Sequence, residues 1–171
     1  HHGWSYHPTE VNEIHPKLDF DLLGAQLEAC KEIGVNAPVY ISAGFDEKDY
    51  DRHPEWRWIP SKDSEDVLEY HNETHFHHLC FNTPYLDALC SQVEEVMEKY
   101  NPCGIFLDII SPKICYCERC LSDMKAAGLD SDNYEDCKKF SIITFNKYAD
   151  AINASVRKYS DTATIFHNSG H

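Results

Sequence analysis

The chain has 171 residues, of which 42% are hydrophobic and 12% aromatic, a composition typical of globular proteins rather than of disordered or fibrous ones. Its formal net charge of -14 disfavours nucleic acid and anionic membranes as partners, whereas a neutral ligand such as a sugar is compatible with it. No apolar run of about 18 residues occurs, so we expect no membrane span, and we identify no signal peptide. The length predicts a single domain over residues 1–171.

The first two predicted elements are a helix and a strand. Residues 18–34 repeat apolar side chains at helical spacing, and Gly34 suits the position just past the end of a helix. The residues expected on the buried face of this helix are Phe20, Leu23, Leu27 and Cys30. Residues 35–44, VNAPVYISAG, predict a buried strand that stops at a glycine.

A second helix and strand follow. Residues 83–100 predict a helix with Thr83 as the N-cap and Pro84 at the first helical position. The residues expected in its buried stripe are Leu86, Leu89, Val93, Val96 and Tyr100. Residues 104–110, GIFLDII, predict a strand that is apolar throughout except at Asp108.

The third predicted helix covers residues 134–159, and Asp132 with Glu135 resembles a capping box at its start. Its inner face is expected to contain Phe140, Ile143, Ile152 and Val156. Residues 162–170, TATIFHNSG, predict the third strand.

Strands that alternate with helices predict a parallel sheet with right-handed crossovers. The segments that follow the strands are long, whereas those that lead from a helix into a strand are brief. In a (β/α)8 barrel the loops after the strands build the active-site face, and catalytic side chains lie at the strand ends. A complete barrel needs about 250 residues. We therefore predict an α/β fold that is part of a (β/α)8 TIM barrel, from about strand 2 to strand 5.

The spacing of the cysteines indicates a metal site. Cys115, Cys117 and Cys120 fall within six residues, which is more typical of metal ligation than of disulfide bridging. Cys80 lies in the loop after the previous strand, and in a barrel these two loops are neighbours. We therefore predict a structural Zn2+ site that is closed by four thiolates, from Cys80, Cys115, Cys117 and Cys120.

Other interpretations of these cysteines stay open. The cluster could hold reduced thiols, an iron–sulfur centre, or a disulfide if the protein is exported, and Cys137 is an alternative fourth ligand. Reduced zinc thiolates would favour the cytoplasm. Three further cysteines lie in apolar patterns and are expected to be buried thiols: Cys30, Cys90 and Cys103.

Asp108 places a carboxylate near the C-terminal end of an apolar strand, where an ionised group is costly to bury without partners. One interpretation is a structural aspartate that caps a neighbouring loop. The other is a catalytic carboxylate at the mouth of the barrel, because retaining glycosidases use such a group to attack the anomeric carbon.

The segment VEEVMEKYNPCGIFLDII resembles the helix and strand that end on the nucleophilic Asp of α-L-fucosidases, in glycoside hydrolase family 29 and the related family 151. VNAPVYISAGFDE is similar to the family's third strand and its loop, HPKLDFDLLGAQLEACKEIGV to the helix before it, and HHGWSYHPTEV to the end of the second strand. HPEW recurs in the same loop of bacterial relatives. The resemblance covers most of the chain, from the end of strand two through strand five.

This resemblance implies a role for individual residues. Asp108 matches the nucleophile. The residues implied in sugar binding are the pair His1 and His2, the aromatic Trp4 and Tyr6, Tyr40 on the first predicted strand, and His167 and Asn168, which end the third and should point into the same mouth. Imidazoles and amides hydrogen-bond hydroxyls, and aromatic rings cover apolar sugar faces. The implied reaction is retaining hydrolysis of a terminal sugar from an oligosaccharide or glycoside, as in an α-L-fucosidase.

The sequence also departs from the family. Family 29 usually has Trp or Phe before the nucleophile and Gly shortly after it, whereas Leu107 and Ile109 flank Asp108 here, which leaves the sugar specificity open. The acid/base carboxylate is expected outside this chain, so the fragment alone is expected to be inactive. His1 and His2 could be the remnant of an affinity tag, and the sequence leaves a homo-oligomer open.

The cysteine pattern resembles family 42 β-galactosidases, in which a lone Cys before NSP and a C-x-C-x-x-C run correspond to CFNTP and CYCERC here. A β-galactosidase-like hydrolase is therefore an alternative, although the Asn-Glu pair usual after its fourth strand is not supplied at Asp108. A non-catalytic carbohydrate-binding barrel and a zinc-containing interaction domain without a sugar role are the alternatives outside enzymes.

Overall fold

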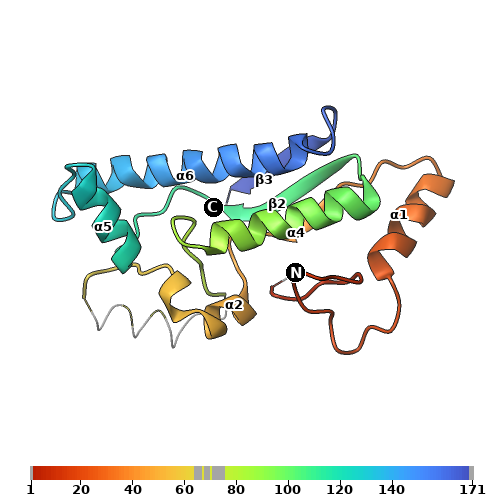
Figure 1. Cartoon of the computed structure of the whole chain (residues 1–171), viewed down its shortest axis with the longest axis horizontal. Helices are drawn as coiled ribbons and strands as arrows, with labels where there is room; N and C mark the ends of the chain where they lie inside the picture. Colours follow the sequence, from red (N-terminus) through yellow and green to blue (C-terminus); the bar gives the residue numbers. More distant parts are fainter. Residues whose placement is uncertain (1, 64–66, 68–69, 71–75, 170–171) are drawn as a thin grey trace.

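The computed structural model describes residues 2–63, 67, 70 and 76–169. A parallel sheet lies at its centre, and its strands follow one another in chain order: β1 (Val39–Ser42), β2 (Gly104–Ile110) and β3 (Thr164–Ser169). Figure 1 shows the two longest helices running beside this sheet: α4 (Tyr85–Tyr100) leads into β2, and α6 (Tyr134–Arg157) leads into β3. The chain is thus a mixed helix and strand fold with a parallel sheet, as the alternation predicts.

Shorter helices occupy the remaining segments: α1 (Leu22–Glu32), α2 (Glu47–Arg52), the 3-10 turn η1 (Pro54–Trp56) and α5 (Glu118–Ala126). The first precedes β1, and the other three lie in the long segments that follow β1 and β2. These long segments are residues 43–84 and 111–133, whereas only 101–103 separate α4 from β2. None of the helices in the described part of the chain is long and apolar enough to span a membrane.

Alternation along the strands separates the two faces of the sheet. Ile105 and Leu107 of β2 are fully buried, and Ile105 pairs with Val39 and Ile165 of the neighbouring strands. This face packs against apolar residues of the two long helices: Leu89, Val93 and Val96 of α4, and Tyr148, Ile152 and Val156 of α6. Each such side chain contributes about 1.5–3 kcal/mol by its burial, so this layer holds the fold together.

The opposite face of the sheet carries a row of three aromatic rings, one from each strand. Tyr40 stacks on Phe106 with ring centroids 5.6 Å apart, and Phe106 stacks on Phe166 at 4.9 Å. Phe166 is 54% exposed and Tyr40 37% exposed. A sheet with apolar side chains on both faces is typical of parallel sheets that are covered on both sides.

The structure corrects several predicted element boundaries. The first helix begins at Leu22, so Phe20 lies outside it and is 55% exposed. The first strand is shorter than predicted, and Val35 is 50% exposed outside it. The α6 N-cap is Asn133 rather than Asp132, because the Asn133 side chain accepts from the amides of residues 135 and 136.

The burial of some single residues also differs from prediction. Ile143 is 48% exposed, because the buried stripe of α6 follows a four-residue step through Phe140, Tyr148 and Ile152, which leaves position 143 off the stripe. Cys103 is exposed rather than buried, since it lies in the turn between α4 and β2, and Cys30 and Cys90 are half-buried.

Candidate functional site

Asp108 lies near the C-terminal end of β2, where the backbone is irregular. The pairing of β2 with β3 shifts register between Leu107 and Ile110. Ile109 has a φ of 59°, a left-handed conformation that costs a β-branched residue roughly 1–3 kcal/mol. Gly44 fits closely beside it, because a Cβ at position 44 would lie 2.1 Å from the Ile109 carbonyl oxygen. Such strain beside a polar strand end is typical of functional sites.

Hydrogen bonds from both neighbouring strands hold the Asp108 carboxylate. The Tyr40 hydroxyl of β1 donates to Oδ2 at 2.8 Å, and the Asn168 amide of β3 donates to Oδ1 at 2.6 Å. The Ser42 hydroxyl lies 3.3 Å from that of Tyr40. Burial, and further the bond to Asp108, raise the pKa of Tyr40, so this hydroxyl stays protonated and can donate at neutral pH. Three adjacent strands thus orient one carboxylate.

The prediction that His167 and Asn168 both point into this site is wrong for His167. Its Nδ1 lies 3.2 Å from the Tyr148 hydroxyl, and its ring meets the Tyr148 ring edge-on. Tyr148 belongs to α6 and is fully buried, so His167 lies on the helix side of the sheet. The reason is that successive residues of a strand point to opposite faces.

The other residues implied in sugar binding lie on the N-terminal segment. The prediction for His1 falls outside the described residues. His2 stacks near Phe45, with ring centroids 6.0 Å apart. Burial lowers the pKa of His2, while the negative charges of Glu47 and Asp108 act to raise it. His2 is therefore within electrostatic reach of Asp108.

A cavity of about 890 Å³ opens beside these residues, between the N-terminal segment, α1, β1 and α4. Four residues implied in sugar binding line it: His2, Trp4, Tyr6 and Tyr40. Asp46 also lines it and is 4% exposed, and its burial raises the pKa of this carboxyl group to about 6. Much of the remaining lining is apolar and comes from α1, β1 and α4. Asp108 does not line this cavity, but Tyr40, which donates to Asp108, connects the two. Aromatic rings and a few polar groups in a largely apolar concave surface suit a small ligand.

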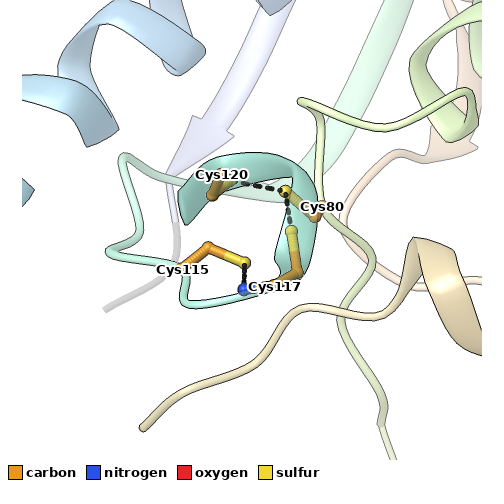
Figure 2. Close-up of side chains that lie close together, drawn as sticks. All are labelled: Cys80, Cys115, Cys117 and Cys120. Carbon is orange, nitrogen blue, oxygen red and sulfur yellow. Dashed lines mark hydrogen bonds between the residues drawn. The ribbon is translucent and has the colours of Figure 1, made fainter. Parts of the chain in front are cut away.

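Figure 2 shows the four cysteines Cys80, Cys115, Cys117 and Cys120, which meet from the segments after β1 and β2. Their sulfur atoms all lie within 4.8 Å of one another, and all four residues are buried. Cys80 Sγ lies 3.5 Å from that of Cys120 and 3.8 Å from that of Cys117. A tetrahedron with Zn–S bonds of about 2.3 Å has sulfur–sulfur edges of about 3.8 Å. The geometry therefore fits a tetrahedral ion.

Amide groups surround this cluster. The amides of Ile59 and Cys117 each donate to Cys115 Sγ at 3.5 Å, and the Asn82 amide donates to Cys80 Sγ at 3.4 Å. Such N–H···S contacts stabilise metal-bound thiolates. Cys137 lies outside the group and donates to the Ser131 carbonyl at 3.4 Å, so the geometry does not favour it as a fourth ligand.

Sequence reasoning missed two buried carboxylates. Asp46 caps α2 by accepting the amides of Lys48 and Asp49. Glu95 of α4 is 8% exposed and accepts a hydrogen bond from His7 at 3.1 Å. The position of Asp46 before a short polar helix could have indicated its cap. The pair of Glu95 with Lys99 has helical spacing, but the partners of Glu95 on residues 7–10 are too distant in sequence for any local signal.

Comparisons with known proteins agree with the resemblance. The family model described as hypothetical glycosyl hydrolase 6 matches residues 1–109. The solved structure of α-L-fucosidase isoenzyme 2 from Paenibacillus thiaminolyticus is 45% identical to the chain with a TM-score of 0.92, over 99% of this chain and 26% of that one. No curated protein is significantly similar to the chain.

The α-galactosidase from Lactobacillus brevis is a more distant structural neighbour. It is 16% identical with a TM-score of 0.57, over 86% of this chain and 18% of that one, so it is similar in fold alone. The chain thus spans about a quarter or less of the length of both solved structures.

Proposed function

The chain belongs to the glycosyl hydrolase family whose model matches residues 1–109, and from that premise we propose that it is the part of a retaining α-L-fucosidase that carries the nucleophile. The fold proposed for the whole protein is a (β/α)8 barrel, of which residues 1–171 form one stretch of the catalytic domain, from about strand 2 to strand 5. The similarity to the Paenibacillus α-L-fucosidase, at 45% identity, supports both the substrate class and the fold.

The aromatic row of Tyr40, Phe106 and Phe166 supports the barrel. It lies on the face of the sheet opposite the helices, which in a barrel faces the interior. Inward-pointing side chains fill the interior of such a barrel, with each layer contributed by alternate strands. The remaining strands of the barrel would then cover these rings.

The orientation of the Asp108 carboxylate is the observation that carries the proposal. One oxygen of Asp108 attacks the anomeric carbon of the fucosyl unit while the bond to the leaving oxygen breaks, and a glycosyl-enzyme forms. An acid/base carboxylate outside residues 1–171 donates a proton to the leaving oxygen and then accepts one from the water that hydrolyses the intermediate. Tyr40 and Asn168 hold the nucleophile in position for this attack.

The walls of the neighbouring cavity suit a sugar. His2, Trp4 and Tyr6 line it together with Tyr40, and in the proposed complex the imidazole binds hydroxyls while the rings cover the apolar face. His1 is proposed to act with His2. His167, which faces Tyr148, has no direct part in this arrangement, whereas Asn168 touches the nucleophile.

We also propose that the four cysteines hold a structural zinc ion. Their buried sulfur atoms lie together at distances that suit tetrahedral coordination. Four protein ligands leave no open position, so the ion would fix the loops after β1 and β2 rather than take part in the chemistry.

Covalent trapping on the full-length protein tests the proposal. A 2-deoxy-2-fluoro-L-fucosyl donor should leave a fucosyl adduct on Asp108, detected by peptide mass spectrometry. Asp108→Asn should abolish both the adduct and the hydrolysis of aryl α-L-fucosides, by at least about a thousandfold in kcat, because no nucleophile remains. Asp150→Asn, the same change at an exposed carboxylate of α6, is a control that should retain activity.

The cysteine cluster favours one second candidate, a β-galactosidase-like hydrolase. A fluorinated galactosyl donor that labels the same peptide, in place of the fucosyl donor, would identify it. Reversible sugar binding without any adduct would instead indicate a non-catalytic carbohydrate-binding barrel and contradict the hydrolase.

A further inference from the structure

Residues 5–15 form a closed loop, here called the N-terminal loop. The Ser5 amide donates to the Glu13 carbonyl at 2.8 Å, and the His15 amide donates to the Ser5 carbonyl at 2.9 Å. These bonds join the two ends of the loop. Trp4 immediately precedes it and Tyr6 belongs to it, so the position of the loop decides where both aromatic rings lie.

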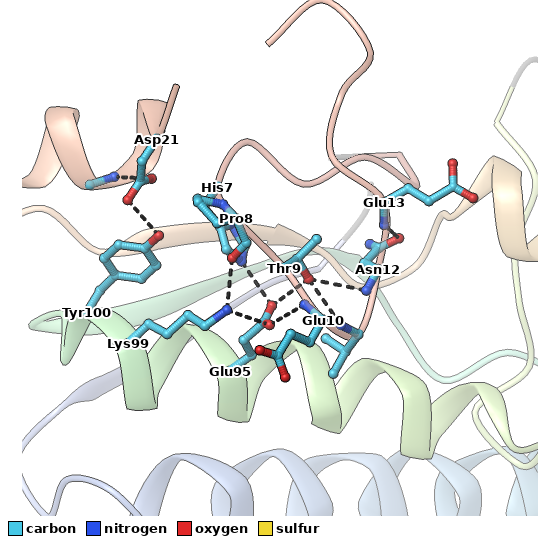
Figure 3. Close-up of polar contacts among 12 residues, drawn as sticks. His7, Pro8, Thr9, Glu10, Asn12, Glu13, Asp21, Glu95, Lys99 and Tyr100 are labelled. Carbon is cyan, nitrogen blue, oxygen red and sulfur yellow. Dashed lines mark hydrogen bonds and ion pairs between the residues drawn. The ribbon is translucent and has the colours of Figure 1, made fainter. Parts of the chain in front are cut away.

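Glu95 of α4 holds one side of this loop (Figure 3). Its carboxylate accepts hydrogen bonds from the Thr9 hydroxyl at 2.6 Å and from the Glu10 amide at 2.7 Å, and it lies 3.1 Å from His7 Nε2. Lys99, one turn further along α4, donates to Glu95 at 2.9 Å and to the Pro8 carbonyl at 2.9 Å. A nearly buried carboxylate with this many donors is a strong local anchor.

Glu13 holds the other side of the loop against α2. Its carboxylate forms ion pairs with Lys48 and Arg52. The Lys48 ammonium also lies 3.7 Å from the centroid of the Trp4 ring, as a cation–π contact. The loop is therefore held between two helices that come from different parts of the chain.

Between these two anchors the loop presents a set of rings. The His15 ring stacks on Tyr6, with centroids 5.4 Å apart and planes 18° apart, and meets Trp4 edge-on at 5.6 Å. Trp4 and Tyr6 line the cavity of about 890 Å³. His15 thus supports from behind the two rings that face the cavity.

We propose that Glu95 is a positioning residue for sugar binding, which acts by holding the N-terminal loop so that Trp4 and Tyr6 form one wall of the sugar site. This inference rests on the proposed function, because it takes the cavity to be the sugar site. Glu95 itself lies in the cavity lining together with His7, but its carboxylate oxygens are occupied by Thr9, the Glu10 amide and Lys99. We therefore assign it a positioning role rather than a contact with the sugar. Its loss lets the loop move away from α4, so that the wall is no longer preformed and the sugar must order it on binding.

The test compares Glu95→Gln with Glu94→Gln in the full-length protein. Both changes remove one carboxylate from α4, but the Glu94 carboxylate is bonded to Ser155 of α6 and to Lys158 just past its end, on the side away from the loop. Glu95→Gln should raise KM for an aryl α-L-fucoside about tenfold and change kcat less than about threefold, because a wall binds ground state and transition state alike. Glu94→Gln should change neither.

Two further measurements test the role of Glu95 without relying on catalytic turnover. Hydrogen exchange of residues 5–15 should rise in Glu95→Gln and not in Glu94→Gln. The Kd of L-fucose, measured by calorimetry, should rise about tenfold in Glu95→Gln. An unchanged Kd with a freed loop would overturn the positioning role, as would an unchanged loop. If the wild-type protein binds L-fucose and shows these shifts but forms no adduct on Asp108, hydrolysis fails while the inference stands.

Discussion

The hydroxyl of Tyr40 and the amide of Asn168 each hold one oxygen of Asp108. Neither group is itself a nucleophile at neutral pH. An amide nitrogen is not nucleophilic, and burial raises the pKa of Tyr40, so its hydroxyl stays protonated. Their contribution to the reaction is geometric, because a misplaced carboxylate loses much of the rate advantage of a bound reactant. Removing the Tyr40 hydroxyl therefore tests directly how the nucleophile is oriented.

Tyr40→Phe in the full-length protein should lower kcat about 10- to 100-fold with a smaller change in KM. A hydrogen bond to a charged group is worth about 1.5–3 kcal/mol, and here it orients the attacking oxygen. Steady-state kinetics on an aryl α-L-fucoside measure the effect. Tyr134→Phe is the matched control, because Tyr134 is 66% exposed at the start of α6. Equal kcat values for wild type and Tyr40→Phe would contradict the orienting role.

Glu95 makes stability depend on pH. Burial would raise the pKa of Glu95, but the hydrogen bonds from Thr9, the Glu10 amide, Lys99 and His7 outweigh it and lower the pKa from 4.5 to about 2. Because the pKa is lowered in the folded state, this stabilisation is present above pH 4.5 and is lost as the pH falls toward 2.

The free energy of unfolding of the wild type should accordingly exceed that of Glu95→Gln by roughly 2 kcal/mol at pH 7, and this difference should shrink at pH 3. Urea unfolding of the full-length proteins at both pH values measures it. If the difference in unfolding free energy between wild type and Glu95→Gln is the same at pH 7 and pH 3, the charge of Glu95 does not contribute to stability.

In the part of the chain that the structure describes, α2, η1 and α5 are the regular elements of the long segments after β1 and β2. Their junction is the cysteine cluster, which is surrounded by Met124, Phe140, Trp58 and Ile114. Trp58 also donates from Nε1 to the Ile114 carbonyl at 2.7 Å. Long loops are costly to order, and a bound ion at their junction would offset part of that cost.

If the four cysteines hold zinc as proposed, Cys120→Ser should abolish its binding and lower Tm by several degrees, because metal-binding free energy adds to folding free energy in such sites. Elemental analysis should find one zinc per wild-type chain, in addition to any held elsewhere in the full-length protein, and one fewer in the variant. Cys103→Ser, at an exposed thiol, should change neither quantity. Equal zinc content in all three proteins would contradict the metal site.

The described sheet carries its aromatic row on the face opposite the packed helices. A parallel sheet is normally covered on both faces, and the chain corresponds to only 26% of the length of the Paenibacillus α-L-fucosidase. The proposed barrel places Tyr40, Phe106 and Phe166 in its interior, where a charged side chain without a partner would be costly.

Phe166→Asp in the full-length protein should therefore lower Tm strongly or prevent soluble expression, although Phe166 is 54% exposed within residues 1–171. Differential scanning calorimetry measures the change. Tyr134→Asp introduces the same charge at another exposed ring, on the surface of α6, and should be tolerated. Similar Tm values for both variants would contradict the proposed barrel interior.

The order of elements and the unusual position of Asp108 could be predicted from the sequence, because both depend on local patterns. Helical spacing places Leu89 and Val93 on one face of α4, and an apolar run with one carboxylate predicts β2. Three of the four clustered cysteines stand within six residues, so their proximity follows from chain connectivity alone.

Which side chains meet depends on how the folded chain packs. Glu95 and His7 are 88 residues apart in sequence, and no local pattern predicts that contact. The period of two along a strand shows that His167 and Asn168 face opposite sides, but the pairing with β2 and the packing of α6 decided which of them reaches Asp108. Sequence patterns record short-range periodicity, whereas a site depends on long-range packing that brings distant segments to one place.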